Sequence, residues 1–323
     1  MIRQNDSIHR KSMVQIIYVT VKNLDLPIGG VIVQAAHVAS LRRAGFDAKL
    51  ASLHEKGLPR WVDQDAVFEN SNQLAISPDD ILVLHDSLPR EVFDRFLAMP
   101  VRRVFFCQNH YFLGGTLQPH ERLADFPIDA FNCVSEPIAA HLRSVHGVAD
   151  PIIIRPPIRP GRSERFVKKV QICYMPRKRL VECGTITYRF RYLYPEIADT
   201  PFISIHDKHP DEVAAIMAES AVFLSLSRNE GLGLPPLEAM ANGCVVVGYH
   251  GGGGLDYATP ENGRWYDEAT PDNLVPLLAE TVSSLRADAG AFAELVESGR
   301  RTIGGYTHQA MDDALLAFWR SFL

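Results

Sequence analysis

The chain has 323 residues, of which 46% are hydrophobic and 22% are charged, and its formal net charge is −5. This balance is that of a globular protein and excludes a disordered or fibrous chain. A mildly acidic chain is not expected to bind nucleic acid, which requires a basic surface. At about 150 residues per domain, the length predicts two domains.

The cysteines and the apolar runs indicate where the protein works. Five cysteines stand far apart, and no two of them form a C-x-x-C pair, so we expect them to be reduced and mostly buried. No apolar run approaches the ~18 residues of a membrane span, and the opening MIRQNDSIHRKS does not resemble a signal peptide. The sequence therefore predicts a cytoplasmic protein and leaves peripheral contact with a membrane open.

The first half alternates short apolar runs with helix-like stretches. Strands are expected over 14–21, 81–85, 104–107, 131–134 and 152–154, and helices over 31–43, after Pro89 and over 138–146. The apolar runs are continuous, which is typical of strands buried on both faces of a parallel sheet. This pattern predicts a doubly wound, Rossmann-like α/β domain over residues 1–160.

A proline-rich, basic segment at 155–169 interrupts this pattern and is the best candidate for a linker. The alternation then resumes, with strands expected over 170–174, 202–205, 222–226 and 244–248 and helices over 210–220, 235–242 and 271–286. We therefore expect a second α/β domain over 161–305. The apolar stripe of 306–323 predicts a helix that crosses back to the first domain, with Trp319 and Phe322 touching residues numbered below 160.

The most informative segment is 225–256, SLSRNEGLGLPPLEAMANGCVVVGYHGGGGLD. Glu230 and Glu238 are separated by seven residues, and the glycines after Glu230 allow a ligand to approach the backbone closely. Pro235 and Pro236 fit only the first turn of a helix, which places Glu238 about one turn into it. A helix start suits a phosphate, and two carboxylates can accept hydrogen bonds from hydroxyls at two points of one ligand. These features together describe a site for a nucleotide sugar.

This string resembles the signature of the retaining, nucleotide-sugar-dependent glycosyltransferases of group 1, a family 4-like group with the GT-B fold. The match covers the loop E-G-x-G-L-P, the helix P-x-E-A-M-A-x-G, the strand C-V-V-V and the glycine-rich loop after it. The resemblance implies two Rossmann-like domains facing each other across a cleft. It also implies that Glu230 contacts hydroxyls of the donor sugar and that Glu238 binds the ribose. The residues implied to line the donor between them are Gly231, Leu232, Gly233 and Leu234, with Leu232 standing where the family commonly has an aromatic residue.

Three cations follow the first strand expected in the second half: Arg177, Lys178 and Arg179. A guanidinium with a nearby ammonium can neutralise a pyrophosphate leaving group, and the resemblance assigns this role to Arg177 and Lys178. Where the family usually has a lysine, this chain has the run 181–183, Val-Glu-Cys, so Lys178 would supply the second cation. A solvated basic turn is the alternative interpretation, and it suits Arg179 better than Arg177.

Candidate site residues of the first half also follow predicted strands. Gly29 and Gly30 resemble the family's glycine loop, which lines the diphosphate and acceptor side of the cleft. His110 occupies the place of a histidine that in the family contacts the donor sugar at its reacting face. Further candidates for lining the cleft are His85, Asp86 and Asn109. Other histidines, among them His141 and His146, are interpreted as surface residues.

The resemblance implies a glycosyltransferase that moves a sugar from a nucleoside diphosphate to a glycan, lipid or small-molecule acceptor, with retention and without a metal or other cofactor. Asp63-Gln64-Asp65 matches the D-x-D string of metal-dependent transferases, but that motif belongs to a different fold, and we interpret it as a solvated turn. Two alternatives stay open: another GT-B enzyme, such as a sugar-nucleotide epimerase or a phosphorylase, and a degenerate glycan-binding subunit.

Overall fold

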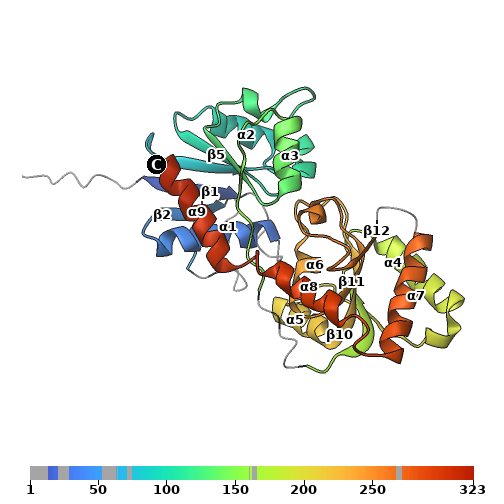
Figure 1. Ribbon diagram of the computed structural model, residues 1–323. Coiled ribbons are helices and arrows are strands. Elements are labelled where there is room, and N and C mark those ends of the chain that lie inside the picture. Colours follow the sequence, from blue (N-terminus) through green and yellow to red (C-terminus); the bar gives the residue numbers. More distant parts are fainter. Residues whose placement is uncertain are drawn as a thin grey trace, which may run out of the picture.

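The computed structural model describes residues 14–20, 29–52, 63, 65–70, 75–159, 161, 166–266 and 271–323. Within these residues the chain forms two parallel sheets with helices packed on them (Figure 1). The α/β class and the two doubly wound sheets predicted from the sequence are therefore confirmed.

The first sheet has the strand order β3-β2-β1-β4-β5-β6-β7. Its strands are β1 (Gln15–Thr20), β2 (Asp47–Ser52), β3 (Phe68–Asn70), β4 (Ile81–His85), β5 (Arg102–Cys107), β6 (Ala130–Cys133) and β7 (Ile152–Ile153). The segments between them include α1 (Gly29–Arg43), α2 (Arg90–Leu97), α3 (Glu136–Ser144) and the 3-10 turns η1 (His110–Gly115) and η2 (Leu123–Asp125). β2 and β3 were not expected, because polar residues interrupt their short apolar pattern.

The second sheet has the order β12-β11-β10-β8-β9. Its strands are β8 (Lys169–Tyr174), β9 (Phe202–Ser204), β10 (Ser220–Leu226), β11 (Val245–Tyr249) and β12 (Arg264–Tyr266). Around them lie α4 (Leu180–Leu193), α5 (Pro210–Glu219), α6 (Leu234–Ala241), α7 (Pro271–Ala287), α8 (Ala293–Ile303) and the 3-10 turns η4 (Pro195–Ile197) and η5 (Gly253–Asp256). The sequence-based prediction omitted α4, α8 and β12; α4 was missed because its apolar residues occur on opposite faces of the helix.

The burial of the strands follows from their continuous apolar runs. Every residue of β4 and of β11 is buried, as expected where helices cover both faces of a parallel sheet. All five cysteines are buried and unbridged, and each lies in a described segment. No helix in the described part of the chain is long and apolar enough to cross a bilayer.

Helix α9 (His308–Phe322) follows the second sheet in the chain but packs on the first. The Ser40 hydroxyl on α1 donates to a carboxylate oxygen of Asp312 at 2.5 Å. Arg102 donates to the Phe322 carbonyl, and its guanidinium carbon lies 4.0 Å from the centre of the Phe322 ring. Trp319 is fully buried in the apolar cluster of the first sheet. Helix α9 therefore contacts residues numbered below 160, on α1 and β5.

The linker between the sheets runs along α6 and the start of α9. The backbone N–H of Ile158 donates to the carbonyl of Tyr306 at 2.8 Å. Gly161 passes so close to the end of α6 that a Cβ there would lie 1.6 Å from the carbonyl oxygen of Ala241. Residues 160 and 162–165 of the predicted linker lie outside the described residues.

Candidate active site

The loops that follow β5 and β10 meet at the junction of the two sheets. A Cβ on Gly231 would lie 1.8 Å from the carbonyl oxygen of Gln108, so only glycine allows this approach. The Asn109 side-chain amide donates to the carbonyl of Asn229 at 3.0 Å. The Ser135 hydroxyl donates to the carbonyl of Gly231 at 2.6 Å. The loop that contains Asn229 and Gly231 therefore also holds the two halves of the molecule together.

The starts of α1 and α6 face each other across this junction. A Cβ on Gly29 would lie 3.4 Å from Cδ1 of Leu234, and Gln108 Nε2 donates to the carbonyl of Gly30 at 3.0 Å. Gly233 precedes α6 with φ = 85°, a left-handed conformation that glycine adopts without strain. Since the N-terminus of a helix carries partial positive charge, two converging helix starts favour an anion between them.

Lys178 and Glu230 form an ion pair beside the helix starts. Lys178 Nζ lies 2.8 Å from Oε1 of Glu230 and also donates to the carbonyls of Arg228 at 2.8 Å and Asn229 at 3.3 Å. Asn229 has φ = 50°, and this turn lets the backbone N–H of Glu230 donate to the carbonyl of Gly251 at 2.9 Å. The side chains of the pair remain 28% and 21% exposed, so a ligand can reach both.

The other two cations after β8 differ in burial. Arg177 is exposed. The Arg179 side chain is only 8% exposed, and its guanidinium pairs with Glu182 at 2.8 Å. That guanidinium also donates to the carbonyl of Ser227 at 3.4 Å and lies 4.6 Å from the centre of the Tyr249 ring. The interpretation of Arg179 as a solvated residue is therefore wrong, because packing between α4 and the end of β11 holds its side chain.

Glu238 lies in the second turn of α6 and is half-buried. Burial raises the pKa of its carboxyl, while the positive charge of Arg159 in the linker acts in the opposite direction. Glu238 therefore lies close to the linker, one helical turn beyond the residues that meet at the junction.

His85 and Asp86, at the end of β4, are both buried. The Asp86 carboxylate accepts hydrogen bonds from the backbone N–H groups of Gln108 and Asn109. His85 Nδ1 accepts from the backbone N–H of Ser87 at 3.2 Å, and its Nε2 has no hydrogen-bond partner among the described residues. Asp86 therefore fixes the shape of the loop after β5, a role that the sequence did not indicate.

His110 begins η1 and is half-buried. The centre of its ring lies 4.1 Å from that of Tyr111 and 4.4 Å from that of His141, and His146 follows 5.3 Å from His141. Burial and the neighbouring His141 lower the pKa of His110 to about 4, so its ring is neutral at pH 7. The interpretation of His141 and His146 as surface residues is corrected, since tertiary packing places both in this cluster of rings.

Asp256 joins three parts of the chain through a side chain that is 0% exposed. Its carboxylate accepts from Arg155 Nε at 2.7 Å, from the Tyr306 hydroxyl at 2.6 Å and from the backbone N–H of Glu136 at 2.7 Å. Burial raises the pKa of Asp256, but these hydrogen bonds outweigh it and hold the pKa below its usual value. The ionised carboxylate therefore ties η5 to the linker, α3 and the segment before α9.

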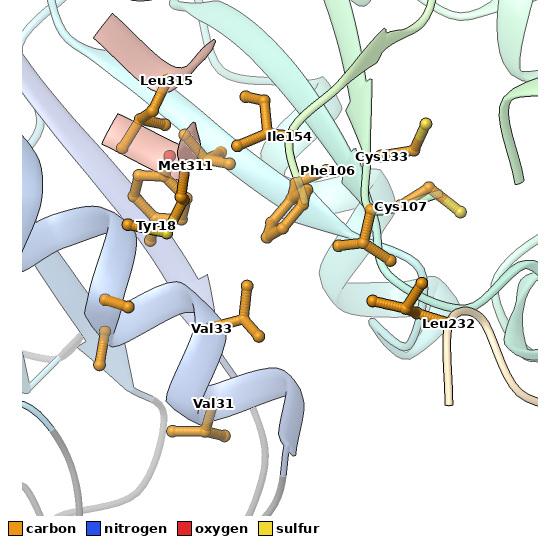
Figure 2. Close-up of a cluster of buried hydrophobic side chains, with 14 of the residues drawn as sticks. Tyr18, Val31, Val33, Phe106, Cys107, Cys133, Ile154, Leu232, Met311 and Leu315 are labelled. Atoms are coloured by element: carbon orange, nitrogen blue, oxygen red, sulfur yellow. The ribbon is translucent and has the colours of Figure 1, made fainter. Parts of the chain in front are cut away.

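The Leu232 side chain points from the loop after β10 into the core of the first sheet. It is 4% exposed and belongs to the apolar cluster that contains Cys107 and Cys133 (Figure 2). Met311 and Leu315 of α9 belong to the same cluster. The Leu232 side chain therefore serves packing between the two halves, and its backbone alone is left for a ligand.

Metal-ligating residue types do not converge in the described part of the chain. No group of three or more His, Cys, Asp or Glu side chains there is placed to hold a metal ion. Arg43 Nη1 lies 3.5 Å from Oδ2 of Asp63 and 3.2 Å from Oδ2 of Asp65. The backbone N–H of Asp65 donates to Oδ1 of Asp63 at 3.0 Å. Their 31% and 67% exposure fits the solvated turn predicted for this string, whose Gln64 lies outside the described residues.

Comparison with known proteins gives one family and one fold. Residues 200–294 match the family model described as glycosyl transferases group 1. The curated alpha-1,6-glucosyltransferase of Actinobacillus pleuropneumoniae serotype 7 (strain AP76) is 29% identical over 237 residues, which are 69% of this chain and 69% of that protein. The crystal structure of a glycosyltransferase from Rickettsia africae ESF-5 superposes with a TM-score of 0.64 at 14% identity, over 96% of this chain and 98% of that one. Anabaena Alr3699/HepE in complex with UDP-glucose gives a TM-score of 0.65 at 11% identity, over 95% and 99%.

The family match and the structural similarity cover different shares of the chain. The matched segment runs from the residues before β9 to the start of α8 and contains both Glu230 and Glu238. The structural similarity extends over both sheets and nearly the whole chain. Residues 200–294 therefore match the group 1 glycosyltransferases, and the chain as a whole has the GT-B fold of the glycosyltransferases on which it superposes.

Proposed function

We propose that this glycosyltransferase moves a sugar from a nucleoside diphosphate to an acceptor hydroxyl, with retention of configuration and without a metal. The observation that supports the proposal most is the junction where the starts of α1 and α6 face each other beside the Lys178–Glu230 pair. Two helix N-termini and an ammonium group supply positive charge where the diphosphate would lie. In such a site the protein itself neutralises the leaving group.

The parts of a nucleotide sugar fit the residues around this junction. The diphosphate lies over the backbone of Gly29, Gly30 and the loop 231–234, and the exposed Arg177 reaches it from the edge. Glu230 accepts hydrogen bonds from the sugar hydroxyls, and Glu238 accepts them from the ribose. Charge-assisted hydrogen bonds of this kind contribute about 1.5–3 kcal/mol each.

The reaction replaces one bond at the anomeric carbon of the sugar. The bond from this carbon to the phosphate oxygen breaks, and a bond from the acceptor oxygen forms on the same face. The acceptor proton moves to the released phosphate oxygen, so no carboxylate nucleophile is needed. Lys178 and Arg177 stabilise the charge that develops on the leaving diphosphate, and the neutral His110 forms a hydrogen bond to the donor sugar at its reacting face.

For the substrates, we propose a UDP-sugar donor, with UDP-glucose as the first to test, and a carbohydrate or lipid-linked acceptor. The relative is an alpha-1,6-glucosyltransferase, and the structural neighbour HepE is in complex with UDP-glucose. The buried, unbridged cysteines support a reducing compartment such as the cytoplasm.

A screen followed by product analysis tests the proposal. The melting temperature is measured with UDP-, GDP-, ADP- and dTDP-sugars, because a ligand that binds the folded state alone raises it. The stabilising donor is then incubated with carbohydrate acceptors, and proton NMR reads the anomeric configuration of the product. The proposal expects an α-linked product from an α-configured donor, at a rate that EDTA does not change.

Several outcomes would contradict it. A β-linked product would overturn retention, and activity lost with EDTA and restored by Mn²⁺ would overturn metal independence. Isomerisation of the donor without an acceptor would favour the epimerase alternative, and phosphorolysis of a glycan would favour the phosphorylase. A chain that binds glycans but no nucleotide sugar would be the degenerate subunit.

A further inference from the structure

Tyr111 is an exposed aromatic residue at the junction of the two sheets. It is the second residue of η1, directly after His110, and it is 46% exposed. Its backbone N–H donates to Oδ1 of Asn109 at 3.1 Å, and the amide of the same asparagine donates to the carbonyl of Asn229 at 3.0 Å. The loop after β10 therefore helps to hold the backbone of Tyr111 in place.

The hydroxyl end of the Tyr111 ring reaches across the junction to the glycine-rich loop after β11. A Cβ on Gly252 would lie 2.5 Å from the Tyr111 hydroxyl oxygen, so any side chain there would displace the tyrosine. Gly252 has φ = 83°, which glycine adopts without strain, and it forms a β-bridge with Glu230. The Tyr111 ring therefore lies between His110 and the backbone partner of Glu230.

Part of the Tyr111 ring is covered and part of it is open to solvent. The centre of the His110 ring lies 4.1 Å away, with 33° between the two planes, so this imidazole covers one face. The hydroxyl end lies against Gly252. The exposed area therefore lies mainly on the opposite face and the free edge of the ring. We call this opposite face the open face of Tyr111.

The place of the open face in the reaction follows from the proposed function, on which this inference rests. His110 is there assigned to the reacting face of the donor sugar, where the acceptor oxygen attacks. The acceptor must therefore come close to His110. Two rings of the described residues pack on His110, those of Tyr111 and His141. Because His141 is half-buried in α3, Tyr111 is the one of the two that offers an exposed surface to the acceptor.

We propose that a pyranose ring of the acceptor stacks on the open face of Tyr111, so that the acceptor is a glycoside. The C–H groups on one face of a pyranose pack on an aromatic ring, while the hydroxyls around its rim stay free for hydrogen bonds. Stacking fixes the plane of the acceptor ring beside His110, and with it the direction from which its hydroxyl reaches the anomeric carbon. Tyr111 thereby determines the specificity for the acceptor.

The alkyl chain of a lipid acceptor is the competing occupant, and the surroundings of the ring disfavour it. The three groups described around Tyr111 are polar: the His110 imidazole, the Asn109 amide and the backbone of Gly252. An alkyl chain would shield such groups from water without offering them a hydrogen bond, whereas the hydroxyls of a sugar can offer one. A single aromatic face among polar groups therefore suits a sugar ring.

Saturation-transfer NMR in the presence of UDP tests this inference with the methyl pyranosides of glucose, galactose, mannose and N-acetylglucosamine. At least one of them should bind the unaltered chain, whereas sorbitol, an open-chain polyol, should not. Y111A should weaken this binding about tenfold, and Y111F, which keeps the ring, should change it by less than about twofold. The control variant Y188A removes an exposed tyrosine that packs on another ring of α4 and should bind like the unaltered chain.

Steady-state kinetics with UDP-glucose separates a role in acceptor binding from a role in joining the two halves. Y111A should raise the KM for the pyranoside about tenfold and leave the KM for the donor and the affinity for UDP unchanged. Equal losses of UDP and pyranoside affinity would show that Tyr111 only joins the two halves, and would overturn the inference. Equal pyranoside binding by Y111A and Y188A, or no binding of any of the four pyranosides to the unaltered chain, would also overturn it. A loss confined to dodecyl glucoside would assign the ring to a lipid chain instead.

The NMR measurement needs no turnover, so this inference and the proposed function can fail separately. Pyranoside binding that depends on Tyr111, without transfer from any nucleotide sugar, would refute the proposed function and leave a glycan-binding face at Tyr111. Transfer to a pyranoside with the same acceptor KM in Y111A and in the unaltered chain would refute the role of Tyr111 and leave the proposed function intact.

Discussion

Lys178 Nζ lies 2.8 Å from Oε1 of Glu230, and this contact joins the turn after β8 to the loop after β10. The ammonium group also donates to two carbonyls of that loop, so its position does not depend on the carboxylate alone. A bound diphosphate would compete with Glu230 for the ammonium group. Donor binding is thus expected to free the Glu230 carboxylate for the hydroxyls of the sugar.

The first prediction concerns Glu230→Gln, which keeps the shape of the side chain but removes its charge. We expect the transfer rate to fall by roughly a hundredfold, because contacts to the reacting sugar act in the transition state. The affinity for free UDP should not fall, since that ligand has no sugar and the neutral side chain competes less for the ammonium group of Lys178. Initial rates and calorimetric titration with UDP measure the two effects. Glu219→Gln, a partner of the exposed Lys169, serves as control; a matching loss of UDP affinity would show that Glu230 only supports the loop.

The second prediction concerns Glu238→Gln. If Glu238 holds the ribose, the change should weaken UDP and UDP-sugar alike, by roughly tenfold to a hundredfold, because a charge-assisted hydrogen bond is lost. Titration calorimetry with both ligands measures this. Glu212→Gln on the exposed start of α5 is the matched control. Unchanged nucleotide affinity in the Glu238 variant would remove the ribose role.

The third prediction concerns stability and Asp256→Ala. The change leaves Arg155, Tyr306 and the backbone N–H of Glu136 without their shared acceptor. We expect the free energy of unfolding to fall by about 3 kcal/mol, the lower range for breaking a buried pair, because Arg155 stays partly exposed. Urea unfolding measures it, with the exposed Asp313→Ala as control. Equal stability of the two variants would show that these contacts contribute nothing.

The fourth prediction concerns acid stability and His37. This side chain is fully buried in α1, with Nδ1 3.3 Å from the Tyr18 hydroxyl, and burial lowers its pKa to about 3. As the pH falls below about 6.5, the unfolded chain binds a proton that the folded chain excludes, so stability should decrease from there toward pH 3. The full effect is on the order of several kcal/mol.

His37→Leu should therefore flatten the dependence of stability on pH between about 6.5 and 4. Urea unfolding at both ends of this window measures the slope, and His209→Gln at the exposed start of α5 is the control. If the His37 variant and the unaltered chain lose stability equally, other groups govern the acid sensitivity.

The loop around Glu230 could be predicted because its conformation is encoded locally. Glycine supplies the positive φ before α6, and two prolines fix the first turn of that helix. β2 was missed because Lys49 interrupts its apolar pattern, and this lysine is accommodated by Glu69 on β3 at 2.7 Å.

Contacts between distant segments were beyond the sequence. The burial of Arg179 depends on Tyr249, and the role of Asp86 depends on how the loop after β5 folds over it. The Leu232 side chain enters the core of the other half of the molecule. In each case the two contacting residues lie much farther apart in the sequence than one helical turn or one strand repeat. The spacing of apolar residues along the chain therefore cannot predict these contacts.

The packing of α9 on α1 bears on how the chain acquires its structure during synthesis. Ser40 and Asp312 are hydrogen-bonded although 272 positions separate them. A nascent chain that has left the ribosome as far as β7 lacks the helix that covers Tyr18, so part of its apolar core stays open to water and to chaperones. Closing so long a loop is entropically costly, and it becomes favourable once the second sheet has formed and shortened the effective distance. β1 and α1 are synthesised long before α9 and are therefore among the last elements to reach their final packing.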